Sequence, residues 1–494
     1  MTWEWRRHDK ATVLECLKEG RYEAITTSAQ GPLDALAHVA IEMGVFDAVQ
    51  ELEVEREREG IPDILLLRTL TVLPFIEADS FREATGSLFA DVSILLQLGY
   101  TAVQIREGFN HRYRNSQGVK SVESFPCHPE SLREEMKRIK PASLGAFRRR
   151  CIGDLFQRRL VRDRVYAIDG TGLGKEWLLV VLLNVSRERT LLVNWRLLAG
   201  TASEKGSIEA SVVLDMIREV LEIGSPEAIS WLIMDALYAD GPLLATLKYR
   251  YQIDSLVRVP ENRDIYKDME QLVSLEKARW QTHPDVRYVA GHKQSRQVSV
   301  AAVEDLTTWD SFLATAKELG GQEPKLWGCL IHDRLADSQE ESENWALVGT
   351  APFSTGWQGY TFWRLRWRVE NNGFRELKEG WKLEKARWGR SQPLVSTRVT
   401  MSCVAFNVAQ VAKGKDGQRL LHLGIRRLRR ELGREYGVAP VIVYAGHCYG
   451  IFHIEEIMSA LGHPPAESLR PVLRSSDSPP HQTGPPASHP CYFP

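Results

Sequence analysis

Three short apolar runs, separated by turn-like segments, constrain the fold more than any other feature of this chain. They read VYAIDG, WLLVVLLNV and TLLVNWRLL, and the first begins at Val165. All three are rich in β-branched residues, which is typical of strands. A helical pattern over 204–221 and another apolar run over 229–234 follow. Antiparallel strands that give way to alternating helix and strand predict the α/β class, a mixed sheet with helices packed on it.

The rest of the chain divides into segments that differ in predicted secondary structure. We expect a helical N-terminal region over 1–150, a sheet domain over 160–259 and 351–415, a β-rich insertion over 260–350, a C-terminal helical region over 416–463 and a disordered, proline-rich tail over 464–494. In the N-terminal region, two helices over 80–97 and 101–113 break at Gly99. A plain helical hairpin is favoured there over a helix-turn-helix, because the turn glycine is the one diagnostic residue.

Charge and apolar content limit the partners of the protein. Lys and Arg (63) balance Asp and Glu (64), so any nucleic-acid site must be a local patch. No apolar stretch approaches the ~20 residues of a membrane span, and the first residues lack the apolar core of a signal peptide. We therefore expect a cytoplasmic protein without a membrane partner. The seven cysteines contain no CxxC spacing and are interpreted as reduced thiols.

Three acids occupy informative positions. Asp169 is predicted to end the first strand of the three, and Asp235 ends the apolar run that begins at 229. At such a point a side chain leaves the core while its backbone stays rigidly held. The third acid, Glu370, lies on a long helix predicted from about Gly359 to Glu379. There it falls within a stripe of one helix face, with steps of four, three, four, three and four. The stripe consists of Trp363, Trp367, Glu370, Phe374, Leu377 and Trp381.

Two explanations account for a glutamate in that stripe. One is an ion pair with Arg366, one turn earlier, and the other is a metal ion. Metal ligation is favoured because Asp169 and Asp235 also follow buried runs. Three carboxylates from separate segments suit two Mg²⁺ or Mn²⁺ ions, which would activate the attacking oxygen and stabilise the leaving oxygen of a phosphoryl transfer.

Basic residues on the same helix offer a counter-charge for phosphate. Arg375, Lys378 and Lys382 lie largely off the stripe. Arginine clusters at 148–150 and 426–430 could extend this positive charge or be ordinary surface. Such density beside a metal site would suit a nucleic-acid backbone. A solvated helix face paired with neighbouring glutamates explains the charges on the helix equally well.

The segments AIDGTG, LIMDALYADG and WRLRWRVENNGFRELKEGW resemble bacterial insertion-sequence transposases of the DDE type, whose catalytic domain is ribonuclease H-like. The subgroup with a Tyr-x2-Arg-x3-Glu-x6-Lys signature is the most similar. Trp363, Arg366 and Glu370 fall on its first three positions. Tryptophan replaces the tyrosine, and Lys378 comes one residue later than the signature lysine.

The resemblance spans about residues 160–415 and implies cut-and-paste DNA transposition by a bacterial, nucleoid-associated protein. Asp169, Asp235 and Glu370 would hold the metal ions. Arg366 and Lys378 would contact DNA, and we extend that expectation to Trp363, Arg375 and Lys382. The partners would be the terminal inverted repeats of the element and target DNA, bound by a homodimer, with DNA-end binding assigned to residues 1–150.

Two further expectations come from the same resemblance. Some relatives stack an aromatic side chain on a flipped base, a role open to Trp280, Trp309 and Trp327 of the insertion. The alternative function is that of a domesticated, inactive relative that binds DNA without cutting it.

Overall fold

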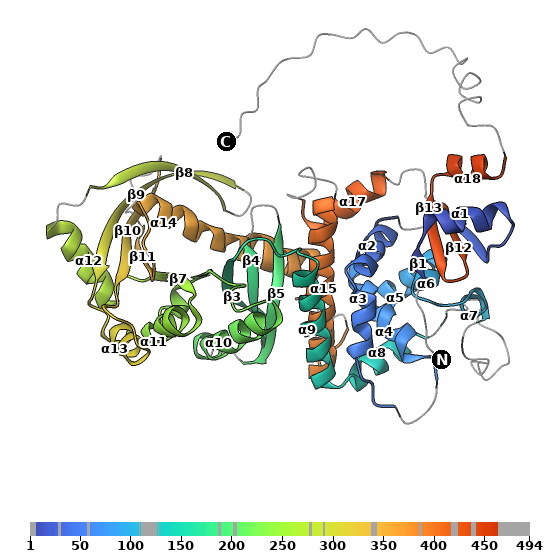
Figure 1. The fold of residues 1–494 in the computed structure, drawn as a ribbon, viewed down its shortest axis with the longest axis horizontal. Coiled ribbons are helices and arrows are strands. Elements are labelled where there is room, and N and C mark those ends of the chain that lie inside the picture. The colour runs from blue at the N-terminus through green and yellow to red at the C-terminus, as the bar shows by residue number, and fades with distance from the viewer. Residues whose placement is uncertain are drawn as a thin grey trace, which may run out of the picture. The chain divides into compact units, whose positions relative to one another are not determined.

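The computed structural model describes residues 6–27, 31–56, 60–107, 109, 126, 128–185, 189–200, 205–275, 279–289, 292–336, 343–384, 388–415, 423–435 and 441–462 (Figure 1). Two compact units are present: Ala29–Gly437 with Met1–Trp5, and Arg6–Ser28 with Val438–Pro494. The tail predicted over 464–494 lies outside the described residues. Among the described helices, none is long and apolar enough to cross a membrane.

A mixed sheet of nine strands forms the centre of the larger unit, in the order β5-β4-β3-β6-β7-β11-β10-β9-β8. Its first five strands are β3 (Val165–Leu173), β4 (Trp177–Val185), β5 (Thr190–Ala199), β6 (Trp231–Met234) and β7 (Asp254–Val259). The predicted meander of β3, β4 and β5 is antiparallel, whereas β6 and β7 continue the sheet in parallel with β3. The predicted ribonuclease H-like mixed sheet flanked by helices is thereby confirmed.

The β-rich insertion continues this sheet. It contains α12 (Asp264–Leu275), β8 (Gln281–Val289), β9 (His292–Leu306), α13 (Asp310–Glu318), β10 (Leu326–Leu335) and β11 (Glu343–Gly349). Because β11 pairs antiparallel with β7, the four insertion strands extend the central sheet past its fifth strand.

Helices cover the sheet and bury its apolar side chains. They include α9 (Pro141–Gln157), α10 (Lys205–Ile223), η3 (Ala236–Tyr238), α11 (Gly241–Ala245), η4 (Thr246–Arg250) and α15 (Gln392–Lys415). α10 packs on β3, β4 and β5, and α15 packs on β5 beside α9 (Figure 1). The core between α10 and the sheet is fully buried at Ile168, Val180, Val193 and Ile217, which fixes the strand that carries Asp169.

Short helices make up the N-terminal region of the larger unit. They are α2 (Gly31–Glu42), α3 (Val45–Ala48), η1 (Val49–Glu51), α4 (Asp63–Val72), η2 (Leu73–Phe75), α5 (Phe81–Phe89), α6 (Val92–Gln97), α7 (Ala102–Glu107) and α8 (Pro129–Arg138). The helix predicted over 80–97 is two helices, because the Asp91 side chain accepts a hydrogen bond from the Ile94 N–H and starts a new one. Of the helix predicted over 101–113, the described part is α7, and 110–113 lie outside the described residues.

The long helix expected over 359–379 is irregular. It begins as α14 (Gly356–Trp363), tightens into the 3₁₀ turn η5 (Arg364–Arg366) and continues through two π-helical segments, η6 (Val369–Phe374) and η7 (Glu376–Gly380). π-Helical turns are rare and often lie at functional sites. They also change which side chains share one face of the helix.

The smaller unit joins the two ends of the chain. Its sheet has the order β1-β13-β12-β2 and comprises β1 (Arg7–His8), β2 (Ala24–Thr27), β12 (Val441–Ala445) and β13 (Cys448–Phe452), packed against α1 (Lys10–Lys18) and α18 (Ile454–Ala460). The prediction that 416–463 is helical was therefore wrong for β12 and β13. It holds for α18 and for α17 (Ile425–Glu435), which lies in the larger unit.

Candidate active site

Asp169 and Asp235 lie at matching points of two neighbouring strands. β3 and β6 are parallel, with Ala167 opposite Ile233, and each aspartate comes two residues after that pair. The prediction that Asp169 ends its strand was wrong, because β3 continues to Leu173 in its pairing with β4. The parallel pairing with β6 nevertheless stops before it, so both carboxylates emerge at the same edge of the sheet.

The two aspartates differ in burial. Asp169 is 7 % exposed, and its Oδ1 accepts a hydrogen bond of 2.8 Å from the Gly170 N–H. Burial raises the pKa of Asp169 to about 6, against the lowering effect of nearby Arg366. The side chain of Asp235 is 31 % exposed, and its Oδ1 accepts from the Ala236 N–H at the start of η3.

One buried guanidinium brings the third acid into this group. Arg366 Nη1 lies 2.9 Å from Asp169 Oδ2 and 3.9 Å from Asp235 Oδ2, while its Nη2 lies 2.8 Å from Glu370 Oε1. The Arg366 side chain is 5 % exposed. Burial works to lower the pKa of Arg366, but the three carboxylates outweigh it and raise that pKa above its ordinary value. The three acids thus surround one positive charge.

Trp363 holds the helical segment against the sheet at this point. Its side chain is buried, and its indole N–H donates a hydrogen bond of 3.3 Å to the carbonyl of Met234, the residue before Asp235. Trp345 packs against it with ring centroids 4.7 Å apart. Contrary to our expectation of a DNA contact, Trp363 is a core residue that positions η5 and η6 over the end of β6.

The acids suit a hard cation in chemistry, although Arg366 fills the space between them. Within the described residues, no three carboxylate, imidazole or thiolate groups lie close enough together to hold one metal ion as they stand. Mg²⁺ and Mn²⁺ need carboxylate oxygens at about 2.0–2.6 Å, whereas a guanidinium keeps its surrounding acids farther apart. All three side chains are oxygen donors, the ligand type that hard divalent ions prefer, so the donor set fits such an ion while the present spacing, with Arg366 between the acids, does not.

Glu370 was predicted as a site residue because its stripe would be buried, and the structure shows that this reason was wrong. The expected stripe would press Glu370 against the core, but its side chain is 52 % exposed and forms the ion pair with Arg366 that we had treated as the alternative. The 3₁₀ and π-helical turns shift the buried face to Arg366 and Val369. On the same helical segment, the side chain of Glu376 is buried, with 8 % exposed, and lies 3.3 Å from Lys413 of α15.

The basic residues predicted to contact DNA are mostly paired. Arg375 is exposed and lies 3.3 Å from Glu379, and Lys378 lies 3.0 Å from Glu384. Lys382 is 12 % exposed and donates to the Asp79 carboxylate at 2.7 Å, so it ties the end of η7 to the N-terminal helices. Sequence reasoning missed this structural role of Lys382 and the central place of Arg366 among the acids; the i, i+4 spacing of Arg366 and Glu370 was the available signal.

Of the three insertion tryptophans considered for base stacking, Trp280 is the most accessible at 38 %. One face of its ring stacks on His332, with ring centroids 4.2 Å apart. Trp309 and Trp327 are partly buried, and Trp309 packs against the core of the central sheet.

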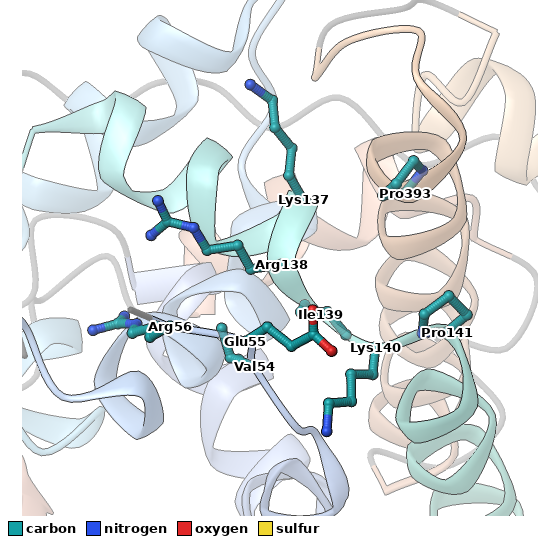
Figure 2. Close-up of a pocket in the computed structure, with 9 residues that line it drawn as sticks. All are labelled: Val54, Glu55, Arg56, Lys137, Arg138, Ile139, Lys140, Pro141 and Pro393. Atoms are coloured by element: carbon teal, nitrogen blue, oxygen red, sulfur yellow. The ribbon is translucent and has the colours of Figure 1, made fainter. Parts of the chain in front are cut away.

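A separate groove of about 950 Å³ lies where α8 passes into α9, near the start of α15. Figure 2 shows its lining residues, Val54, Glu55, Arg56, Lys137, Arg138, Ile139, Lys140, Pro141 and Pro393. Three of its four cations are paired with acids, since Arg56 contacts Glu135, Lys137 contacts Glu134 and Lys140 contacts Glu53. The groove is therefore only weakly positive, and none of the three site acids lines it.

Comparison with known proteins agrees with this geometry. Residues 163–408 match the family model described as "Transposase DDE domain". The matched segment begins just before β3 and ends within α15, and it contains Asp169, Asp235 and Glu370. No curated protein matches the chain.

Proposed function

Because this chain belongs to the DDE transposases, we propose that it catalyses cut-and-paste DNA transposition. It binds the terminal inverted repeats of its element, hydrolyses a DNA strand beside them and joins the freed 3′-hydroxyl to target DNA. The observation that carries the proposal is the convergence of three carboxylates, from β3, β6 and η6, on the single guanidinium of Arg366.

The three acids are proposed as the metal ligands. Asp169, Asp235 and Glu370 would hold two Mg²⁺ or Mn²⁺ ions, which when bound supply Lewis-acid activation of the attacking and leaving oxygens. Asp169 is fixed most firmly, by burial and by its hydrogen bond with the Gly170 N–H. Glu370 is the most exposed of the three and lies on π-helical η6, a type of turn that often occurs at functional sites.

Arg366 has two proposed roles. Without metal it neutralises the acids, so that a buried carboxylate has a partner. With the acids engaged in holding divalent ions, Arg366 would turn its guanidinium away from them and could pair with a DNA phosphate at the cleaved bond. Arg375 and Lys378 would contact the backbone beside it, since their side chains are 60 % and 25 % exposed.

The remaining parts of the proposal concern assembly. The N-terminal region, residues 1–150, would bind the DNA ends, and its contribution to the groove of Figure 2 supplies Arg138 as an exposed cation. The active complex would be a homodimer, as the family resemblance implies.

The test is strand cleavage of a supercoiled plasmid that carries the gene with its flanking DNA. We expect the wild type to nick this plasmid in Mg²⁺, and Asp169→Asn, Asp235→Asn and Glu370→Gln each to abolish nicking while DNA binding remains measurable. Glu379→Gln is the matched control, because Glu379 is an exposed glutamate two turns along the same helical segment.

The outcomes separate the proposal from its alternative. Full nicking by one acid variant would remove that residue from the site. A wild-type protein that retards DNA in a gel and never nicks it would instead identify an inactive, domesticated DNA-binding relative.

A further inference from the structure

Helix α17 presents arginines to solvent on one face. Ile425, Leu428 and Leu432 are buried on its inner face, while Arg427 and Arg430 are exposed on the opposite side. This spacing is that of an amphipathic helix, but its outer face is cationic. The helix lies beyond residues 163–408, the segment that matches the transposase family.

α17 is fastened to the helical segment that carries Glu370. Arg426 Nη2 donates to the Glu379 carbonyl at 3.1 Å, and the Arg429 guanidinium lies 5.4 Å from the centroid of the Trp381 ring. The backbones approach closely, because a Cβ added at Gly380 would lie 2.5 Å from Ile425 Cγ2. The position of α17 relative to η7 is therefore fixed by packing and by polar contacts.

The outer arginines are not neutralised by the protein. Arg426 and Arg429 contact Glu77, whereas no side-chain partner is present for Arg427 or Arg430 among the residues that the structure describes. The groove of Figure 2 differs in this respect, since acids pair with three of its cations. An exposed pair of unneutralised arginines is the stronger candidate for binding an external polyanion.

The surface lies within reach of DNA bound at the acids. From Glu370 to Glu379, where Arg426 attaches, the rise is at most roughly 13 Å, the value for a regular α-helix, which equals about four base-pair steps of duplex. A duplex held at the active site therefore need extend only a short way to meet α17.

We propose that Arg427 and Arg430 form a DNA-backbone contact that lies outside the matched catalytic domain. This inference rests on the proposed function. The two guanidinium groups would pair with phosphates of the same duplex that enters the site of the three acids. It carries no sequence information, because phosphates are the same at every base pair.

The experiment measures how the affinity of the full-length protein for DNA depends on salt. The probe is a random-sequence duplex of about 40 base pairs, titrated between about 50 and 200 mM salt. Arg427→Gln/Arg430→Gln should lower the slope of log affinity against log salt by about 2, and lower the affinity roughly 60-fold at ~0.1 M salt. Arg427→Lys/Arg430→Lys should keep most of the slope, since the charge remains.

The matched control is Arg218→Gln/Lys267→Gln. These two cations are also exposed, but each is paired with an aspartate of its own helix, so the slope should stay at the wild-type value. An unchanged slope for Arg427→Gln/Arg430→Gln would overturn the proposed contact. The proposed function would still stand in that case if the wild type nicks the plasmid. A wild type that neither binds nor nicks DNA would overturn both.

Discussion

Replacing Asp169 by asparagine should stabilise the protein above about pH 6, although it should abolish cleavage. The Asp169 carboxyl is buried, and its pKa is raised from 3.8 to about 6. Burial therefore disfavours the ionised form more than the ion pair with Arg366 favours it. Asparagine is neutral at every pH, and its side-chain oxygen can still accept the Gly170 N–H.

The direction of the pH dependence follows from proton binding. Between about pH 4 and 6, the folded protein holds a proton on Asp169 that the unfolded chain has released, so the free energy of unfolding falls as the pH rises. Above about pH 6 both states are ionised and the loss is complete. The difference between 3.8 and about 6, at about 1.36 kcal/mol per pH unit, corresponds to about 3 kcal/mol.

The assay is urea unfolding of the wild type and Asp169→Asn in a metal-free buffer, at pH values from about 4 to 8. The variant should be more stable by up to about 3 kcal/mol near neutrality, with the advantage vanishing toward pH 4. Adding Mg²⁺ should then stabilise the wild type and not the variant. An Asp169→Asn protein that is less stable than the wild type near neutrality would refute the reasoning, because the ion pair with Arg366 would then outweigh desolvation.

Two further predictions concern packing around the same helical segment. Glu376→Ala should lower the free energy of unfolding by about 3–5 kcal/mol, because it leaves the buried Lys413 ammonium without its carboxylate. In the same urea titration, the double variant Glu376→Leu/Lys413→Met should lose clearly less free energy of unfolding. Equal losses would exclude the ion pair as the cause. Gly380→Ala should cost about 1–3 kcal/mol through its clash with Ile425. The loss caused by Gly380→Ala should be smaller in an Ile425→Ala background, which lacks the clashing Cγ2, and an equal loss in both backgrounds would place the strain elsewhere.

The parts of the fold that follow from local pattern are predictable from the sequence. The meander from β3 to β5 and the run that becomes β6 are continuous apolar stretches, and burial on both faces of a sheet selects such stretches. β3 and β6 are parallel neighbours, with Ala167 opposite Ile233. Asp169 and Asp235 each come two residues after that pair and therefore emerge at the same edge of the sheet. Their proximity therefore depends on strand order, and strand order follows from the chirality and shortness of connections.

Long-range pairing is what the sequence does not reveal. β1 has two residues, and its partner β13 lies near the other end of the chain, with Arg7 opposite Cys448. No local pattern marks so short a strand, because its stability comes from a sheet assembled from both chain ends. The extension of the central sheet by β11 is of the same kind, since it depends on which edge strand of the sheet, β7 or β5, is left open.

The helical segment that carries Glu370 shows how a correct residue can be chosen for an incorrect reason. A period of 3.6 residues places Trp363, Trp367 and Glu370 on one face, and a buried glutamate then requires a neutralising group. In the structure, η5 tightens and η6 widens the helix, so that Arg366 turns inward and Glu370 turns to solvent. The pairing of the two side chains follows from their i, i+4 spacing, whereas the inward turn of Arg366 places its guanidinium beside Asp169.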